Sequence, residues 1–324
     1  MNFTKRFTQI ACISIGIAAG FSAVAQTFPS KIIRVVNPAA PGGNSDVFFR
    51  LLQPKMSEFL GQQLVFDYRP GAGGTVGGEI ISKSPPDGYT AGLVAASFVI
   101  NPSMIKKMSY STLKDFTALG LIVDVPSGLV VHPALPVKSL KELIALAKAR
   151  PSQLFCSSSG RATVGHMSLE LLNSMADIKI THVPYKGAGP AVIDLIAGHV
   201  QMQFSSLPLL AGHVQQGRLR LIAQTGEKRS GFAKAVPTML EAGLPGYVVS
   251  SGFSFIGPAG IPRAIAERLN GALVASLRDP ANRKFLIEQG AEPVGSTLDE
   301  HDAYIKAEVA KWIKVVKQAG IEPQ

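Results

Sequence analysis

The sequence predicts an α/β fold in which mainly parallel sheets are flanked by helices. Short apolar runs alternate with segments of helical periodicity along the chain, which is the pattern of repeated β-α units. The chain shows neither an internal repeat nor a low-complexity stretch, so solenoid and fibrous folds are disfavoured.

The N-terminus has the features of a secretory signal. Lys5 and Arg6 precede an apolar run at 10–21, and Ala23-Val24-Ala25 supplies small residues at the cleavage positions. The run is short for a membrane span, so an uncleaved anchor is the weaker alternative. We expect residues 1–25 to be a signal peptide that is cleaved after Ala25, which places the mature protein in the periplasm.

Composition bounds the mature chain. Removing 25 of the 324 residues leaves 299, enough for two domains, and lowers the formal net charge from +10 to +8. Cys156 is then the only cysteine, which excludes an intramolecular disulfide. The positive charge favours anionic ligands. Nucleic acid is disfavoured as a partner, because the basic residues are scattered and form no stripe with aromatic side chains.

The elements are expected in the following order. Apolar runs predict strands at 31–37, 64–68, 90–98, 153–160, 178–183, 199–204 and 219–225. Helical patterns predict helices at 45–61, 77–83, 139–151, 166–175, 187–198, 207–217 and 297–320. Ser139 with Glu142, and Thr297 with Glu300, have the spacing of capping boxes, and Pro54 is expected to kink its helix.

Four loops rich in glycine and hydroxyl residues recur between a strand and a helix. They lie at 38–46, 70–78, 157–166 and 184–190. A single such loop is usually only a turn. Ligands of α/β proteins bind at the carboxyl ends of strands, where all four loops are expected, so together they favour a shared binding site.

The glycine-rich loops do not have the spacing of nucleotide-binding motifs. Gly71 and Gly73 are followed by Val76 where a dinucleotide fingerprint requires its third glycine. The segment Gly160–Gly165 is followed by His166 and Met167 instead of the lysine and hydroxyl residue of a P-loop. An anion cradle made of backbone N–H groups remains compatible with these loops.

Catalytic and metal-binding motifs are absent from the sequence. There is no G-x-S-x-G elbow and no H-E-x-x-H motif, and the six histidines lack ligand spacing. Ser111 and Lys114 match S-x-x-K without its companion motifs, which indicates a chance match. We therefore predict no catalytic residue, no metal and no cofactor.

Four blocks of the sequence carry a resemblance to a known family. FPSKIIRVVNPAAPGGNSD, RPGAGGTVGGEIISKSPPDGYT, VPYKGAGPAVIDLIAGHVQMQF and GFSFIGPAGIPRAIAERLN resemble the signature blocks of the Bug/TctC family, the periplasmic solute receptors of tripartite tricarboxylate transporters. The similarity extends over essentially the whole mature chain and in the same order.

The resemblance implies a two-domain periplasmic binding protein of the type II-like "Venus flytrap" class. Domain 1 would comprise 27–124 plus 252–324, and domain 2 would comprise 125–251. A small organic anion would be held in the cleft between them and delivered to inner-membrane transporter subunits. We expect the receptor to be a monomer.

The resemblance also implies a set of ligand-binding residues on the four loops. They are Pro41, Gly42, Gly43, Ser45, Gly73, Gly74, Thr75, Gly77, Ser158, Ser159, Gly160, Thr163, His166, Tyr185, Lys186 and Gly187. Family ligands are gripped largely through backbone amides and hydroxyls, so no arginine clamp is expected. Asp46 would organise its loop, since its negative charge would oppose a bound carboxylate. For His166 the alternative to a ligand contact is a capping role. For Lys186 the alternative is a solvated position at the rim of the cleft.

Departures from the family pattern affect the ligand and not the fold. Asn37 stands where a Val-Pro pair normally starts, Val47-Phe48-Phe49 precedes Arg50, and Ser205-Ser206 follows a strand. Two other functions stay open at this point. One is a hydrolase of a small anion with Ser158 or Ser159 as nucleophile, and the other is a ligand-sensing subunit of a membrane signalling protein.

Overall fold

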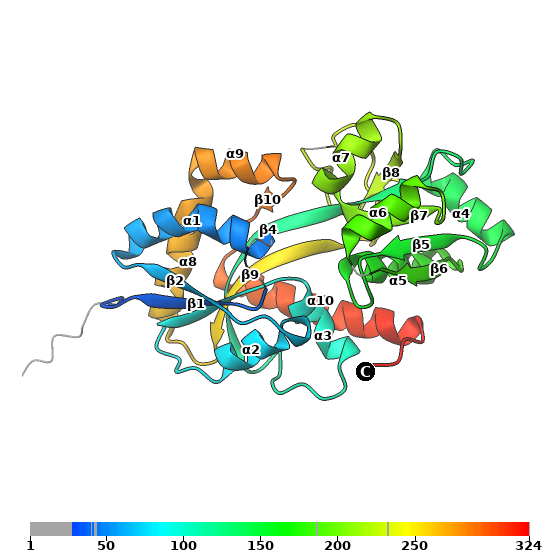
Figure 1. Ribbon diagram of the computed structural model, residues 1–324. Helices are drawn as coiled ribbons and strands as arrows, with labels where there is room; N and C mark the ends of the chain where they lie inside the picture. Colours follow the sequence, from blue (N-terminus) through cyan, green and yellow to red (C-terminus); the bar gives the residue numbers. More distant parts are fainter. Residues whose placement is uncertain (1–27, 40, 42–43, 186, 232, 324) are drawn as a thin grey trace, which may run out of the picture.

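The computed structural model describes residues 28–39, 41, 44–185, 187–231 and 233–323. Within these residues one sheet of ten strands runs through the molecule in the order β2-β1-β3-β9-β4-β7-β5-β6, and β8 and β10 pair with β4 beside this path. Helices flank the sheet along its length (Figure 1). The predicted α/β class is confirmed.

The strands at the two edges of the sheet are parallel. The first half contains β1 (Ile33–Asn37), β2 (Leu64–Tyr68) and β3 (Thr90–Val94). The second half contains β5 (Phe155–Ser158), β6 (Thr181–Pro184) and β7 (Met202–Ser206). We call these the first half and the second half below.

The centre of the sheet is antiparallel, which limits the prediction of mainly parallel strands to the two edges. The central strands are β4 (Phe116–Val131), β9 (Ser250–Pro258), β8 (Arg220–Gln224) and β10 (Glu292–Pro293). The chain leaves the first half through β4 and returns through β9 (Figure 1), so these two strands must run in opposite directions.

The predicted domain crossings fall inside this central pair. Asp124 lies opposite Gly252, and Val125 lies opposite Ser251. The crossings are therefore two hydrogen-bonded strands and not loose linkers. The division into 27–124 plus 252–324 and 125–251 stays a prediction, which we take up below.

Helices cover both faces of each half. The helices of the first half are α1 (Asn44–Leu60), α2 (Thr75–Ser82) with the 3-10 turn η1 (Ala72–Gly74), α3 (Ser97–Met104), α8 (Arg263–Arg278) and α9 (Pro280–Glu288). Those of the second half are α4 (Leu140–Ala149), α5 (Val164–Ala176), α6 (Ala188–Ile196) and α7 (Leu207–Gln215).

The C-terminal helix α10 (Leu298–Gln318) joins the two halves. Its apolar stripe Ile305, Val309, Trp312 and Val316 is buried, in the same apolar cluster as residues of α3 and α5. Figure 1 shows α10 running beneath both halves. The predicted capping box is confirmed, because the Thr297 side chain accepts from the Glu300 N–H and the Glu300 side chain accepts from the Thr297 N–H.

One predicted strand is wrong in part. The apolar run at 90–98 was expected to be a single strand, but β3 ends at Val94 and α3 begins at Ser97. Turn hydrogen bonds from the Phe98 N–H to the Ala95 carbonyl and from the Val99 N–H to the Ala96 carbonyl redirect the chain. Pro54 lies inside α1, and the helix continues past it to Leu60.

Candidate functional site

The strand-end loops of the first half border a cavity of about 360 Å³. Its walls come from the loops after β1, β2 and β3, so the carboxyl ends of three neighbouring strands meet there. Among the described residues that line it, none is Asp, Glu, Lys, Arg or His. An anion in this cavity would therefore depend on neutral donors.

The predicted residues of the first two loops differ in how they relate to this cavity. Ser45, Gly73 and Gly74 line it, whereas Pro41 is exposed and does not. Gly42 and Gly43 lie outside the described residues. Gly73 and Gly74 have positive φ angles of 66° and 92°, which glycine adopts without strain.

Thr75 and Gly77 make their contacts within the protein. The Thr75 hydroxyl donates to the Ala72 carbonyl at 3.0 Å. A Cβ atom at Gly77 would stand 2.8 Å from the Pro38 ring, so glycine is needed for the close packing of α2 against the first loop. Both residues shape the loops more directly than they could contact a ligand.

Asp46 is buried in the first turn of α1, and the partners of its carboxylate include Tyr68 and Arg50. Oδ1 accepts from the Tyr68 hydroxyl at 2.5 Å and from Arg50 Nε at 2.8 Å. The Arg50 guanidinium also stacks over Phe66. Burial, together with the bond to Asp46, raises the pKa of Tyr68. This geometry supports the predicted loop-organising role of Asp46.

Three groups the sequence analysis did not propose as ligand contacts also line the cavity: Asn37, Asn101 and Tyr110. The Asn101 Nδ2 atom donates to the Gly73 carbonyl at 3.1 Å and so supports the second loop from α3. For Asn101 the available signal was the loop between β3 and α3, which the prediction of 90–98 as one strand hid.

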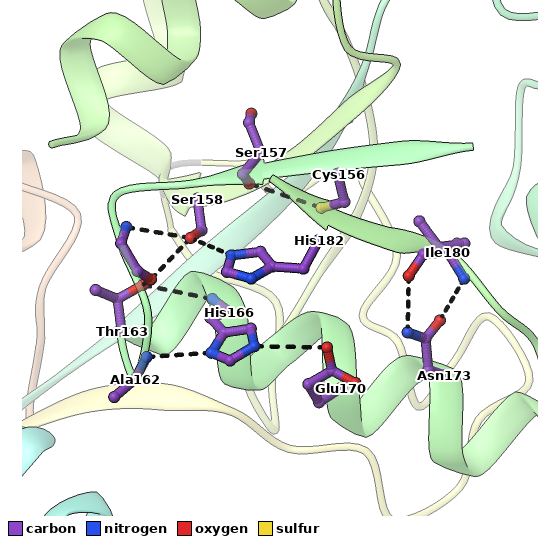
Figure 2. A network of polar contacts seen from close by, with 11 residues as sticks. Cys156, Ser157, Ser158, Ala162, Thr163, His166, Glu170, Asn173, Ile180 and His182 are labelled. Atoms are coloured by element: carbon purple, nitrogen blue, oxygen red, sulfur yellow. Dashed lines mark hydrogen bonds and ion pairs between the residues drawn. The ribbon is translucent and has the colours of Figure 1, made fainter. Parts of the chain in front are cut away.

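In the third loop, 157–166, the hydroxyls of Ser158 and Thr163 make hydrogen bonds within the protein (Figure 2), whereas no such bond involves the Ser159 hydroxyl among the described residues. The Ser158 Oγ atom lies 2.6 Å from His182 Nε2 and also contacts the Gly160 backbone, donating to O at 2.8 Å and accepting from N at 3.1 Å. Thr163 caps α5, since its hydroxyl accepts from the His166 N–H and donates to the Gly160 carbonyl.

His166 and His182 form a stacked pair beneath this loop (Figure 2). The ring centroids are 3.9 Å apart, with 17° between the planes. His166 Nδ1 accepts from the Ala162 N–H at 3.1 Å, and Nε2 lies 3.5 Å from Glu170. Burial, with the neighbouring His166, lowers the pKa of His182 to about 4. The pair is thus a support for the loop, which favours the capping role for His166.

The fourth loop is tied to the third by backbone hydrogen bonds. The Tyr185 N–H donates to the Ser158 carbonyl at 3.0 Å, and the Gly187 N–H donates to the Ser159 carbonyl at 3.1 Å. The Tyr185 hydroxyl donates to Asp194 at 2.6 Å. Burial is the larger cause and this hydrogen bond the smaller one of the rise in the pKa of Tyr185 to about 12. Lys186 lies outside the described residues.

The described part of the chain contains neither a metal-binding cluster nor a membrane-spanning helix. No group of three or more His, Cys, Asp and Glu side chains there has a geometry suited to a metal ion. None of the helices found in that part has the length and apolar character needed to cross a membrane.

The chain has two sheet halves, which a pair of antiparallel strands joins and which carry loops at their strand ends. This is the architecture of periplasmic solute-binding proteins. Within this class, the chain belongs to the TctC family, because residues 48–321 match the family model described as "Tripartite tricarboxylate transporter family receptor". The resemblance to Bug/TctC receptors is confirmed.

Relatives and solved structures agree with this assignment. The chain is 35% identical to "Protein BugT" of Bordetella pertussis over 99% of both chains. It is 36% identical to a solved structure described as "R. palustris Rpa4515 with adipate", with a TM-score of 0.76, covering 92% of this chain and 100% of that one. It is 28% identical to "MatC (Rpa3494) from Rhodopseudomonas palustris with bound malate", with a TM-score of 0.72 and coverages of 89% and 100%.

Proposed function

We propose that the mature protein binds a small organic acid through a carboxylate and delivers it to the inner-membrane subunits of a tripartite tricarboxylate-type transporter. The observation that carries the proposal is the likeness to an adipate-bound structure at 36% identity over 92% of the chain. The cavity at the strand ends of the first half supplies a place for one end of such an acid.

The acid is held mainly by neutral donors. No charged side chain among the described residues lines the first-half cavity, and the hydroxyls of Ser45, Thr75 and Thr163 already donate to protein oxygens. The grip then falls on backbone N–H groups, including those in the first turns of α5 and α6. Each such helix-end interaction contributes about 0.3–1 kcal/mol when exposed, so several act together.

Binding closes the two halves over the acid. In this proposal domain 1 is 27–124 plus 252–324, domain 2 is 125–251, and the paired residues Asp124 and Gly252 mark the hinge. Glu292, which pairs with Asp124, also accepts a hydrogen bond from the Gly231 N–H of the second half. This contact lies beside the crossing strands, where hinge motion displaces atoms least.

The receptor works as a monomer in the periplasm, after removal of residues 1–25. The leader lies outside the described residues, so its sequence pattern alone supports this part of the proposal. The basic net charge of +8 after cleavage suits the attraction of anions to the exported protein.

A hydrolase is the second candidate function, and one contact favours it. His182 Nε2 is within hydrogen-bonding distance of Ser158 Oγ, as a general base would be. Two observations weigh against catalysis. The Ser158 residue is 0% exposed, and Glu170 lies beside His166 instead of orienting His182. We therefore assign the Ser158–His182 contact to holding the loop.

A screen of acids tests the function. Purified mature protein is examined by native mass spectrometry, first alone and then with succinate, malate, glutarate and adipate. We expect one bound acid per chain, a smaller radius of gyration in small-angle scattering and no consumption of the acid. The absence of binding by all four acids would contradict the receptor proposal, whereas steady turnover of an acid or its ester would favour the hydrolase. A sensing role would share the binding result and differ only in the membrane partner recovered by crosslinking.

A further inference from the structure

Asn37 is the last residue of β1 and lies at the floor of the first loop. It is 0% exposed and lines the first-half cavity. Its Oδ1 atom accepts two hydrogen bonds, from the Ala39 N–H at 3.1 Å and from the Ser45 hydroxyl at 3.2 Å. Only the oxygen of an amide can accept, so these two donors fix the orientation of the side chain.

The other end of this amide has no partner. The Nδ2 atom is buried, and no described residue accepts a hydrogen bond from it. A buried N–H group without an acceptor is costly, and such groups in native proteins usually meet a bound water or ligand. The two bonds to Oδ1 hold the NH₂ group in place without satisfying it.

The surrounding polar groups make this N–H distinctive. The Ser45 hydroxyl donates its hydrogen bond to Asn37 Oδ1, and Asn101 Nδ2 donates to the Gly73 carbonyl. Ser97 and Tyr110 also border the cavity, but a hydroxyl can either donate or accept. The Asn37 NH₂ group can only donate, so it demands an acceptor.

The electrostatic surroundings favour an anionic acceptor without supplying a cation. The carboxylate of Asp46, in the first turn of α1, is engaged by Arg50 and Tyr68. A hydrogen bond from a neutral N–H to an ionised carboxylate is stronger than one to a neutral acceptor, which offsets part of the cost of removing the carboxylate from water.

We propose that Asn37 Nδ2 donates to a carboxylate oxygen of the bound acid, directly or through one water. The proposal rests on the proposed function and assigns a ligand-contacting residue to its site.

The test is the substitution Asn37→Asp, which keeps the shape and the acceptor oxygen but replaces the donor by a second oxygen. The probe is whichever of succinate, malate, glutarate and adipate the wild-type protein binds most tightly, measured by calorimetry at about pH 8 and about pH 5.5. We expect the variant to bind at least about tenfold more weakly at the higher pH. Burial raises the pKa of the introduced carboxyl, so protonation at the lower pH restores a donor and brings the variant-to-wild-type ratio back toward one.

Asn173→Asp is the matched control. Asn173 exchanges two hydrogen bonds with the Ile180 backbone in the second half (Figure 2), away from the cavity. This control is expected to lower the melting temperature and to leave the affinity for the same acid unchanged.

Three results would overturn the inference. The first is that the Asn37→Asp variant binds the acid within twofold of wild type at both pH values. The second is that the variant loses affinity by the same factor at both pH values. If that variant fails to fold, a crystal structure of wild-type protein with the acid decides, and the lack of any acceptor within hydrogen-bonding distance of Nδ2 contradicts the inference. Failure of wild-type protein to bind all four acids would instead remove the proposed function, and the inference with it.

Discussion

The two sets of strand-end loops are built on different principles. In the second half, the side chains of Ser158, Thr163 and Tyr185 are all spent on hydrogen bonds inside the protein. In the first half, positive-φ glycines and amides surround a cavity that contains an unused donor. The loops of the second half are thus preorganised by these side chains, although the buried amide of Gln203 in β7 has no partner among the described residues, whereas the cavity of the first half keeps the Asn37 donor available for a ligand. We infer that specificity resides mainly in the first half and rigidity mainly in the second.

The largest expected effect comes from Gly74→Val. Gly74 lines the cavity at a φ of 92°, and a Cβ there would face Pro38 and Ser97. A branched side chain would be strained and would also enter the cavity, so we expect affinity for the acid to fall by about a hundredfold or more. Calorimetry measures the affinity.

Gly61→Val is the control for backbone strain. Gly61 has a φ of 71° with nothing within 4 Å of an added Cβ. It should lose stability to a similar extent, about 1–3 kcal/mol, and retain full affinity. Equal losses of affinity in the two glycine variants would contradict the assignment of specificity to the first half.

Acidification probes two histidines, the partly buried His182 in the second half and the fully buried His301 in α10. Burial lowers the pKa of His182 and of His301 to about 4, below the ordinary value of 6.5. The unfolded chain therefore takes up protons first as the pH falls, so the stabilisation that is full above about pH 6.5 is lost progressively toward pH 4. We expect a loss of at least about 3 kcal/mol in the free energy of unfolding by pH 4, mainly from the fully buried His301, measured by urea denaturation across this range.

Substituting each histidine separates the two contributions. His182→Gln and His301→Gln should each flatten part of this pH dependence. If both variants leave the pH profile unchanged, the loss of unfolding free energy comes from other groups. The neutral His182 ring would then not be what makes the second half rigid.

Ser158→Ala probes the rigidity of the second half. It removes the partner of His182 and of the Gly160 N–H, and should cost about 1–2 kcal/mol of stability by thermal unfolding. Ser157→Ala is the matched control, because its hydroxyl makes only a 3.4 Å bond to the Met202 carbonyl. Loss of all acid binding in Ser158→Ala with no change in stability would reverse the comparison and point to a reactive serine.

Thr163→Val has the smallest expected effect. The sequence pattern implied a ligand contact for Thr163, but its hydroxyl caps α5. We expect a loss of about 1 kcal/mol in stability and a less than tenfold change in affinity. Ser139→Ala removes the equivalent cap of α4, far from the loops, and should show the same stability loss with unchanged affinity.

Local patterns predicted much of the fold, and pairing over long distances limited the rest. The alternation of strands and helices and the cap at Thr297 depend on neighbouring residues, so they could be read from the sequence. The crossing strand β4 was missed because it contains Gly120, Asp124 and Pro126, residue types that are depleted in strands. It is stabilised by β9, whose sequence lies more than a hundred residues away.

The candidate site was predictable in position and less so in chemistry. Gly73, Gly74 and Ser45 were expected at the binding loops and do line the cavity. Which hydroxyls are free could not be predicted, because the bond between Ser158 and His182 joins two neighbouring strands. The unpartnered N–H of Asn37 likewise depends on where Ala39 and Ser45 donate in three dimensions.

The central claim is that a carboxylate is held by neutral donors of the first half. A crystal structure of the mature protein with the tightest-binding of the four acids tests it most directly. We expect one carboxylate in the cavity bordered by Gly73 and Asn37, with no lysine or arginine side chain in contact with it. An acid bound through a basic side chain, or placed against Ser158 and His182 with the first-half cavity filled only by water, would contradict the account.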